Sequence, residues 1–163
     1  MPDIIKDNQV VADEWTLLAE KDADQIVPEG NHIVPLVTWL AQQDTLSQRS
    51  DIGVWLDSDE APEPLAGSLD HLPLVAVNFP AFADGRGYSY ARLLRERYGF
   101  TGELRAIGEV LRDQLFYLHR CGFNAFALRS DLDAQASLAH MQDFTESYQV
   151  AVDQPVPLFR RRA

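Results

Sequence analysis

Leu74–Phe79 reads Leu-Val-Ala-Val-Asn-Phe, and this run decides the fold. Its nearly continuous apolar character is typical of a parallel strand that is covered on both faces. Two amphipathic segments follow, Tyr88–Tyr98 and Glu109–Arg120, and each leads through a glycine and a phenylalanine into another apolar run. These runs are Glu103–Ile107 and Phe123–Leu128. The alternation predicts two helices and three mutually parallel strands in one sheet.

The ends of the two helices carry a repeated signature. Arg97-Tyr-Gly-Phe and Arg120-Cys-Gly-Phe lie 23 residues apart, a spacing that suits successive helix–strand units. Gly99 and Gly122 are suited to the left-handed position that follows a helix. We interpret the repeat as shared turn chemistry that supports the architecture.

Upstream of Leu74 the sequence predicts a hairpin, a helix and a strand. Within Asp3–Glu20, two β-branched pairs flank turn residues, which indicates the hairpin. Residues 52–56 form a short β-branched and aromatic run, typical of a strand. Residues 33–43 carry apolar side chains at helical spacing, with Trp39 outside the stripe. The stripe consists of Ile33, Leu36, Val37 and Leu40.

The predicted fold is an α/β domain with an open, mostly parallel sheet of about four strands. Helices would cover both faces, and the N-terminal strand or hairpin would precede the sheet. Half of a (β/α) barrel is the alternative. A single domain is expected over 1–150, with 1–25 as a hairpin-like arm. A helix capped by Asp131 would close it, with Leu132, Ala136, Ala139 and Phe144 facing inward, and 151–163 would form an extended or disordered tail.

Composition excludes several classes of protein. The net charge of −11 argues against a nucleic-acid binder, which needs a basic face. No apolar run reaches the ~18 residues of a membrane-spanning helix, so no membrane association is expected. The first residues lack the pattern of a signal peptide, and a single cysteine excludes an internal disulfide. A cytoplasmic location follows as the expectation.

The Gly-Arg-Gly turn follows the first central strand, at the sheet edge where α/β folds bind ligands. Gly85 and Gly87 would let the backbone approach an anion, and Arg86 would add a charged fork. Ser89 would cap the following helix or bind the same anion, and Arg129 would reach the site from another strand end. An ordinary turn with a solvent-facing arginine is the alternative.

An enzyme with its site at this edge would draw its catalytic groups from Asp84, Tyr88 and Glu109, which is expected to open a helix. Asp57, Asp59 and Glu60 are interpreted as solvent-facing acids, and no metal site is predicted. No nucleotide fingerprint, redox cysteine pair or iron–sulfur ligand set is evident, so no cofactor is predicted. Cys121 is predicted at a helix C-terminus, where it would be a packing residue.

Four further motifs are Phe82-Ala-Asp-Gly-Arg-Gly-Tyr-Ser, Arg92-Leu-Leu-Arg, Gly102-Glu-Leu-Arg-Ala-Ile-Gly-Glu-Val-Leu-Arg-Asp-Gln-Leu and Arg120-Cys-Gly-Phe-Asn-Ala-Phe. Together they resemble an uncharacterised proteobacterial family encoded beside assimilatory sulfite reductase, whose members are often labelled oxidoreductases. The resemblance covers roughly residues 20–150. It implies a role in sulfur assimilation, as an accessory or partner of sulfite reductase, and it carries no reaction or catalytic residues with it.

Three functions remain open from the sequence. The first is an accessory protein of sulfite reduction that binds the reductase or a small anion. The second is an enzyme of unknown reaction at the C-terminal ends of the strands, so whether the protein is an enzyme stays undecided. The third is a scaffold that forms a homodimer through its hairpin. A concave polar pocket would favour the enzyme, whereas a flat apolar patch would favour partner binding.

Overall fold

The computed structural model of the chain describes residues 2–81 and 84–141. Its centre is a mixed sheet of eight strands in the order β2-β1-β8-β7-β6-β5-β4-β3. Six consecutive strands run parallel, and each pairs with its neighbours in sequence. They are β3 (Thr16–Leu17), β4 (His32–Pro35), β5 (Ile52–Leu56), β6 (Leu74–Phe79), β7 (Glu103–Gly108) and β8 (Ala125–Phe126).

The three strands predicted from the central stretch are confirmed as parallel neighbours. β6 pairs with β7 along its whole length, from Leu74 opposite Glu103 to Phe79 opposite Gly108. β8 follows with Arg105 opposite Ala125, and it is shorter than the predicted run. The α/β class and the mostly parallel sheet are therefore correct. The expected number of about four strands is wrong, because the sheet also takes in β3, β4 and the N-terminal hairpin.

The predicted hairpin is formed by β1 (Asp3–Lys6) and β2 (Gln9–Ala12), which pair antiparallel. Asp7 and Asn8 occupy the turn with φ values of 50° and 63°, the left-handed conformation that a tight hairpin turn requires. β1 also pairs antiparallel with β8. The hairpin is thus an extension of the sheet, joined to β8, the last along the chain of the strands described.

The predicted helix over residues 33–43 is wrong in its first part. His32–Pro35 forms β4, and only Leu36–Ala41 is helical, as α1, followed by the short α2 (Gln43–Leu46). Trp39, expected outside the buried stripe, is fully buried, whereas Leu40 is 45% exposed. The error arises because Ile33 and Val34 are buried on opposite faces of one strand, and such a pair imitates the start of an apolar helix.

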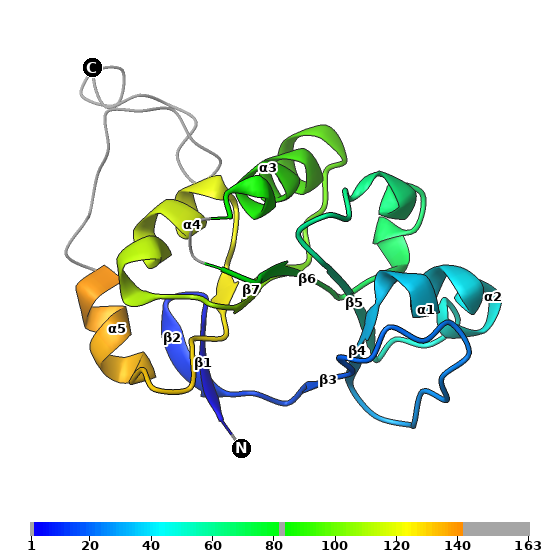
Figure 1. The fold of residues 1–163 in the computed structure, drawn as a ribbon, viewed down its shortest axis with the longest axis horizontal. Helices are drawn as coiled ribbons and strands as arrows, with labels where there is room; N and C mark the ends of the chain where they lie inside the picture. Colours follow the sequence, from blue (N-terminus) through cyan, green and yellow to red (C-terminus); the bar gives the residue numbers. More distant parts are fainter. Residues whose placement is uncertain (1, 82–83, 142–163) are drawn as a thin grey trace.

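The helices pack on one face of the sheet, which corrects the expectation that they cover both. α3 (Arg86–Arg92) continues into a π-helical turn (Leu93–Arg97), α4 (Leu115–Cys121) follows a 3₁₀ turn (Arg112–Gln114), and α5 is Ala134–Met141. Two more 3₁₀ turns, Glu63–Leu65 and Leu69–His71, lie between β5 and β6. Figure 1 shows the strands as a curved row with α5, α4, α3 and α1 along its outer side. Residues from all four helices share the main core cluster.

Half of a (β/α) barrel is therefore the better description of the six parallel strands, since their order is sequential and their helices lie outside. The concave face carries a second, smaller core cluster without any helical residue among those described. It consists of Ile33, Trp55, Leu74, Ala76 and Ile107, with Trp15 and Ala127 packed against them. No helix within residues 2–81 and 84–141 contributes to this cluster on the concave face.

Arg95 connects the two repeated helix–strand turns. Its guanidinium donates to the carbonyl oxygens of Phe100 and Gly102 at 2.8 and 2.9 Å and to that of Gly122 at 2.9 Å. Gly99 and Gly122 have φ values of 67° and 119°, as their predicted role requires. Within residues 2–81 and 84–141, no helix has both the length and the apolar character to span a membrane. Phe144 and the expected tail 151–163 lie outside the described residues.

Candidate functional site

The predicted anion loop contains an arginine that already has a carboxylate partner. Arg86 donates from Nη2 to Asp84 Oδ2 at 2.8 Å and from Nε to Oδ1 at 3.1 Å, and Nη2 also reaches Ser58 Oγ at 3.1 Å. The hydrogen bond from Arg86 lowers the pKa of Asp84 to about 2, so the pair is fully ionised at neutral pH. An anion at this loop would have to compete with Asp84.

Gly87 serves packing in this loop. A Cβ at this position would lie 2.6 Å from Phe79 Cζ, so the glycine allows α3 to approach β6 closely. Gly85 and Ser89 are exposed, and no side chain caps α3. The loop therefore keeps its predicted residues at the strand end, while its buried glycine faces the core.

Tyr88 packs into an aromatic cluster. Its ring centroid lies 5.3 Å from that of Phe79 and 4.9 Å from that of Tyr117. Burial raises the pKa of the Tyr88 hydroxyl, which keeps it protonated at neutral pH. This environment suits a packing side chain better than a group that exchanges protons.

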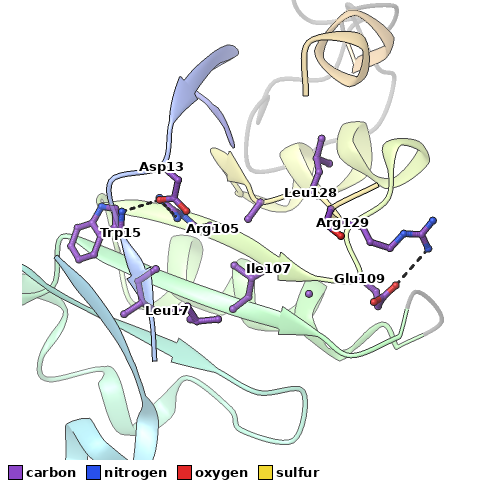
Figure 2. Close-up of a pocket in the computed structure, with 12 residues that line it drawn as sticks. Asp13, Trp15, Leu17, Arg105, Ile107, Glu109, Leu128 and Arg129 are labelled. Atoms are coloured by element: carbon purple, nitrogen blue, oxygen red, sulfur yellow. Dashed lines mark hydrogen bonds and ion pairs between the residues drawn. The ribbon is translucent and has the colours of Figure 1, made fainter. Parts of the chain in front are cut away.

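Glu109 and Arg129 are brought together, as expected for residues that follow neighbouring strands. Arg129 Nη1 lies 3.6 Å from Glu109 Oε2, and the pair is drawn in Figure 2. Glu109 does not open a helix, which corrects that prediction: its N–H donates to Phe79 O at 2.7 Å in the turn after β7. Both residues line a pocket of about 380 Å³ on the concave face, and neither Asp84 nor Arg86 is among its lining residues.

The walls of this pocket come from distant parts of the chain. The segment between β2 and β3 contributes Asp13 and Trp15, β3 contributes Leu17, and β4 contributes Ile33. β7 contributes Arg105 and Ile107, and the residues after β8 close the other side. Figure 2 shows Asp13 and Arg105 toward one end, Glu109 and Arg129 toward the other, and Ile107 between them. The volume falls in the range of small-molecule sites.

Arg105 is the most unusual residue of the pocket, and the sequence analysis missed it. It is a charged residue in the middle of a parallel strand, and only 2% of its side chain is exposed. Nε donates to Glu103 Oε2 at 2.8 Å and Nη1 donates to Asp13 Oδ1 at 2.9 Å. Nη2 is buried and has no hydrogen-bond partner within the described part of the chain. Buried polar atoms are rarely left in this state.

Neither neighbouring carboxylate completes a two-pronged contact with Arg105. The other oxygen of Glu103 is 3.1 Å from Lys6 Nζ, and Asp13 Oδ1 also accepts the N–H of Trp15 at 3.0 Å. Nη2 lies between these two contacts, and neither of its two N–H groups has an acceptor among the described residues. The signal available in the sequence was the alternation of Glu103 and Arg105, which places two charges on one face of an otherwise apolar strand.

A second polar cluster lies at the ends of β5 and β6. Lys21 Nζ is 2.7 Å from Asp57 Oδ2 and 3.9 Å from Glu60 Oε1, and Asn78 Nδ2 donates to Asp57 Oδ1 at 3.0 Å. Asp57 and Glu60 are thus paired with a lysine, and only Asp59 of the three predicted acids is exposed. The described residues contain no group of three or more side chains that could hold a metal ion.

Cys121 is the last residue of α4 and is fully buried, as predicted for a packing residue. Burial raises the pKa of its thiol, which disfavours the reactive thiolate. Its burial and raised pKa thus disfavour the single cysteine of the sequence as a nucleophile in the folded protein.

Comparison with known proteins gives a family and no reaction. A family model described as bacterial protein of unknown function (DUF934) matches residues 53–159, from β5 onward. The match includes β7 with Arg105 and the residues after β8, while Asp13, Trp15 and Ile33 precede it. No curated protein matches the chain.

Proposed function

Because the chain belongs to the DUF934 family of bacterial proteins of unknown function, we propose its function from its own residues: it is an accessory protein of sulfite reduction that binds a small anion in the concave pocket. The observation that supports an anion site is the buried Nη2 of Arg105, which lacks a hydrogen-bond acceptor among the described residues. The link to sulfite reduction is what the family resemblance of the motifs around Asp84–Ser89 and Arg120–Phe126 implies.

The pocket is a better candidate than the Gly-Arg-Gly loop. The guanidinium of Arg86 is exposed and holds a carboxylate through two nitrogens. Exposed ion pairs contribute little energy, and an incoming anion there would replace one such contact with another. At Arg105 an anion would gain the N–H groups of Nη2, which have no acceptor within residues 2–81 and 84–141.

Asp13 is the group with which the anion would compete. It contacts Arg105 through one oxygen only, and it lies in the segment between β2 and β3 with 14% of its side chain exposed. An anion that bridges Nη1 and Nη2 makes two charge-assisted hydrogen bonds where Asp13 makes one. The anion would therefore displace the Asp13 carboxylate toward solvent while Glu103 keeps its contact with Nε.

The decisive experiment is calorimetric titration of the wild type and three variants with sulfite, sulfate and acetate. Asp13→Asn should tighten anion binding about tenfold, since it removes the competing charge and keeps an oxygen for the Trp15 N–H. Glu14→Gln, which removes an equal charge from the exposed neighbouring residue, should leave the affinity within about twofold. Arg105→Lys should lose the two-pronged contact and weaken binding about tenfold. Equal affinities in the Asp13 and Glu14 variants would overturn the site.

The role in sulfite reduction needs a separate test in the native host. A strain that lacks this gene should grow slowly with sulfate or sulfite as its only sulfur source and normally with cysteine. Complementation with the wild type should restore growth, and complementation with the Arg105→Lys variant should restore it only in part. Normal growth of the deletion strain on sulfite would remove this role and leave the binding site to be judged by titration.

A further inference from the structure

The concave pocket is too large and too apolar for an inorganic oxyanion alone. Its volume is about 380 Å³, whereas sulfite has only four heavy atoms. Its lining includes five aliphatic or aromatic side chains, Trp15, Leu17, Ile33, Ile107 and Ala127. An anion bound at Arg105 would leave this apolar surface in contact with water, at a cost that an apolar ligand body would remove.

The polar groups of the pocket stand at its two ends. Arg105, Ile107 and Glu109 follow one another at every second position along β7 and the turn after it. At about 3.3 Å per residue, the Cα atoms of Arg105 and Glu109 are separated by at most ~13 Å. Figure 2 shows Ile107 between the Arg105–Asp13 contact and the Glu109–Arg129 pair. The pocket therefore offers one end with a buried, ion-paired arginine, an apolar stretch and a rim of paired charges.

We propose that the ligand of this pocket is an organic monocarboxylate with an extended apolar body. Its carboxylate bridges Nη1 and Nη2 of Arg105, and its apolar body lies over Ile107 and Ala127. The proposal rests on the anion site proposed above and adds the chemical class of the ligand. The Glu109–Arg129 pair lies beyond the far end of the body and limits its length.

The inference is supported by the chemistry of both ends of the ligand. Burial of Arg105 in a wall with apolar neighbours strengthens its electrostatic interactions, so a carboxylate is favoured there over a neutral acceptor. Each methylene group that is buried against the apolar lining adds to the binding free energy. Inorganic anions have no such groups. A ligand with a carboxylate and an apolar body gains affinity both from the contact with Arg105 and from the burial of its methylene groups.

The test is a homologous series titrated into the full chain: acetate, butanoate, hexanoate and octanoate. Affinity should rise about fourfold per methylene until the body reaches the Glu109–Arg129 pair, and then level off. Hexylamine, which has the same body and the opposite charge, should bind at least about a hundredfold more weakly than hexanoate. Binding should also change the fluorescence of Trp15, and Trp15→Phe should abolish that signal.

Two variants separate the carboxylate from the apolar body. Ala127→Phe should fill the pocket and abolish the dependence on chain length, while acetate still binds. Asp13→Asn should tighten every member of the series by the same factor. If Asp13→Asn tightens sulfite and acetate but chain length has no effect, the anion site stands and the ligand class is wrong. If amines and carboxylates bind alike, or nothing binds, both the ligand class and the anion site are overturned.

Discussion

Lys21 Nζ lies 2.7 Å from Asp57 Oδ2, and this contact ties the segment before β4 to the C-terminal end of β5. Asn78, at the end of β6, holds the other oxygen of the same carboxylate. Burial disfavours ionisation of Asp57, but the hydrogen bonds from Lys21, Asn78 and the Ser58 N–H outweigh it and lower the pKa. The Asp57 carboxylate thus joins the segment before β4 to the C-terminal ends of β5 and β6.

We expect Asp57→Asn to change how stability depends on pH. A carboxyl whose pKa is lowered by folding adds stability above its unfolded pKa near 3.8, and this stability is lost as the pH falls through the folded pKa. At pH 7 the variant should be less stable by about 1 kcal/mol or less, since Lys21 is 40% exposed. The deficit should shrink between about pH 5 and pH 2. Urea unfolding at several pH values measures this, with Asp59→Asn as the control.

Gly108→Ala should destabilise the protein strongly. The residue has φ +89°, and a Cβ there would lie 2.4 Å from Asn78 Oδ1 and 2.5 Å from Phe79 O. Left-handed strain and the backbone contact together should cost at least about 2 kcal/mol. Gly67→Ala is the matched control, because a Cβ at Gly67 meets nothing within 4 Å. Thermal unfolding should separate the two variants, and equal melting temperatures would contradict the geometry of the β7 end.

Gly87→Ala tests whether this glycine serves packing or a ligand. Its Cβ would meet the ring of Phe79, which is held between Tyr88 and Phe123 and cannot easily move. We expect a loss of about 1–3 kcal/mol in stability and unchanged affinity for anions. Gly85→Ala, two residues earlier and exposed, should leave both unchanged. A variant that stays stable and loses anion binding would restore the Gly-Arg-Gly loop as the binding site.

Cys121 should be inaccessible to thiol reagents in the native state. It is fully buried, and burial raises the pKa of its thiol. Labelling at pH 8 should be at least about a hundredfold slower for the folded protein than for the protein in denaturant, since reaction requires an opening of the structure. Cys121→Ala should cost about 1 kcal/mol and leave ligand binding unchanged. Fast labelling of the folded protein would show that the helix end opens readily.

Local sequence patterns were sufficient for the central sheet and its helix ends. Leu74–Phe79 carries an uninterrupted apolar run, and Gly122 ends its helix with a conformation that other residues rarely adopt. The same patterns failed at Ile33 and Val34, since a short strand buried on both faces has no periodicity of its own. The pairing of the hairpin with β8 is a contact between distant segments, and nothing local to either encodes it.

The candidate site was predictable only in part for the same reason. Glu109 and Arg129 could be placed at neighbouring strand ends, because topology alone brings them together. Arg105 meets Asp13 across 92 residues of sequence, and that contact decides which of its nitrogens lacks an acceptor. The sequence shows a charge on a strand, but the unused N–H groups appear only when all neighbours are in place.

The position of β8 between β7 and β1 also sets an order of events during synthesis. The ribosome releases the hairpin β1–β2 long before its partner strand Ala125–Phe126. The edge of β1 that pairs with β8 therefore has no partner while the parallel strands β3 to β7 are synthesised. A translating chain halted before residue 125 would contain β1 and β2 but not the strand that joins them to the sheet.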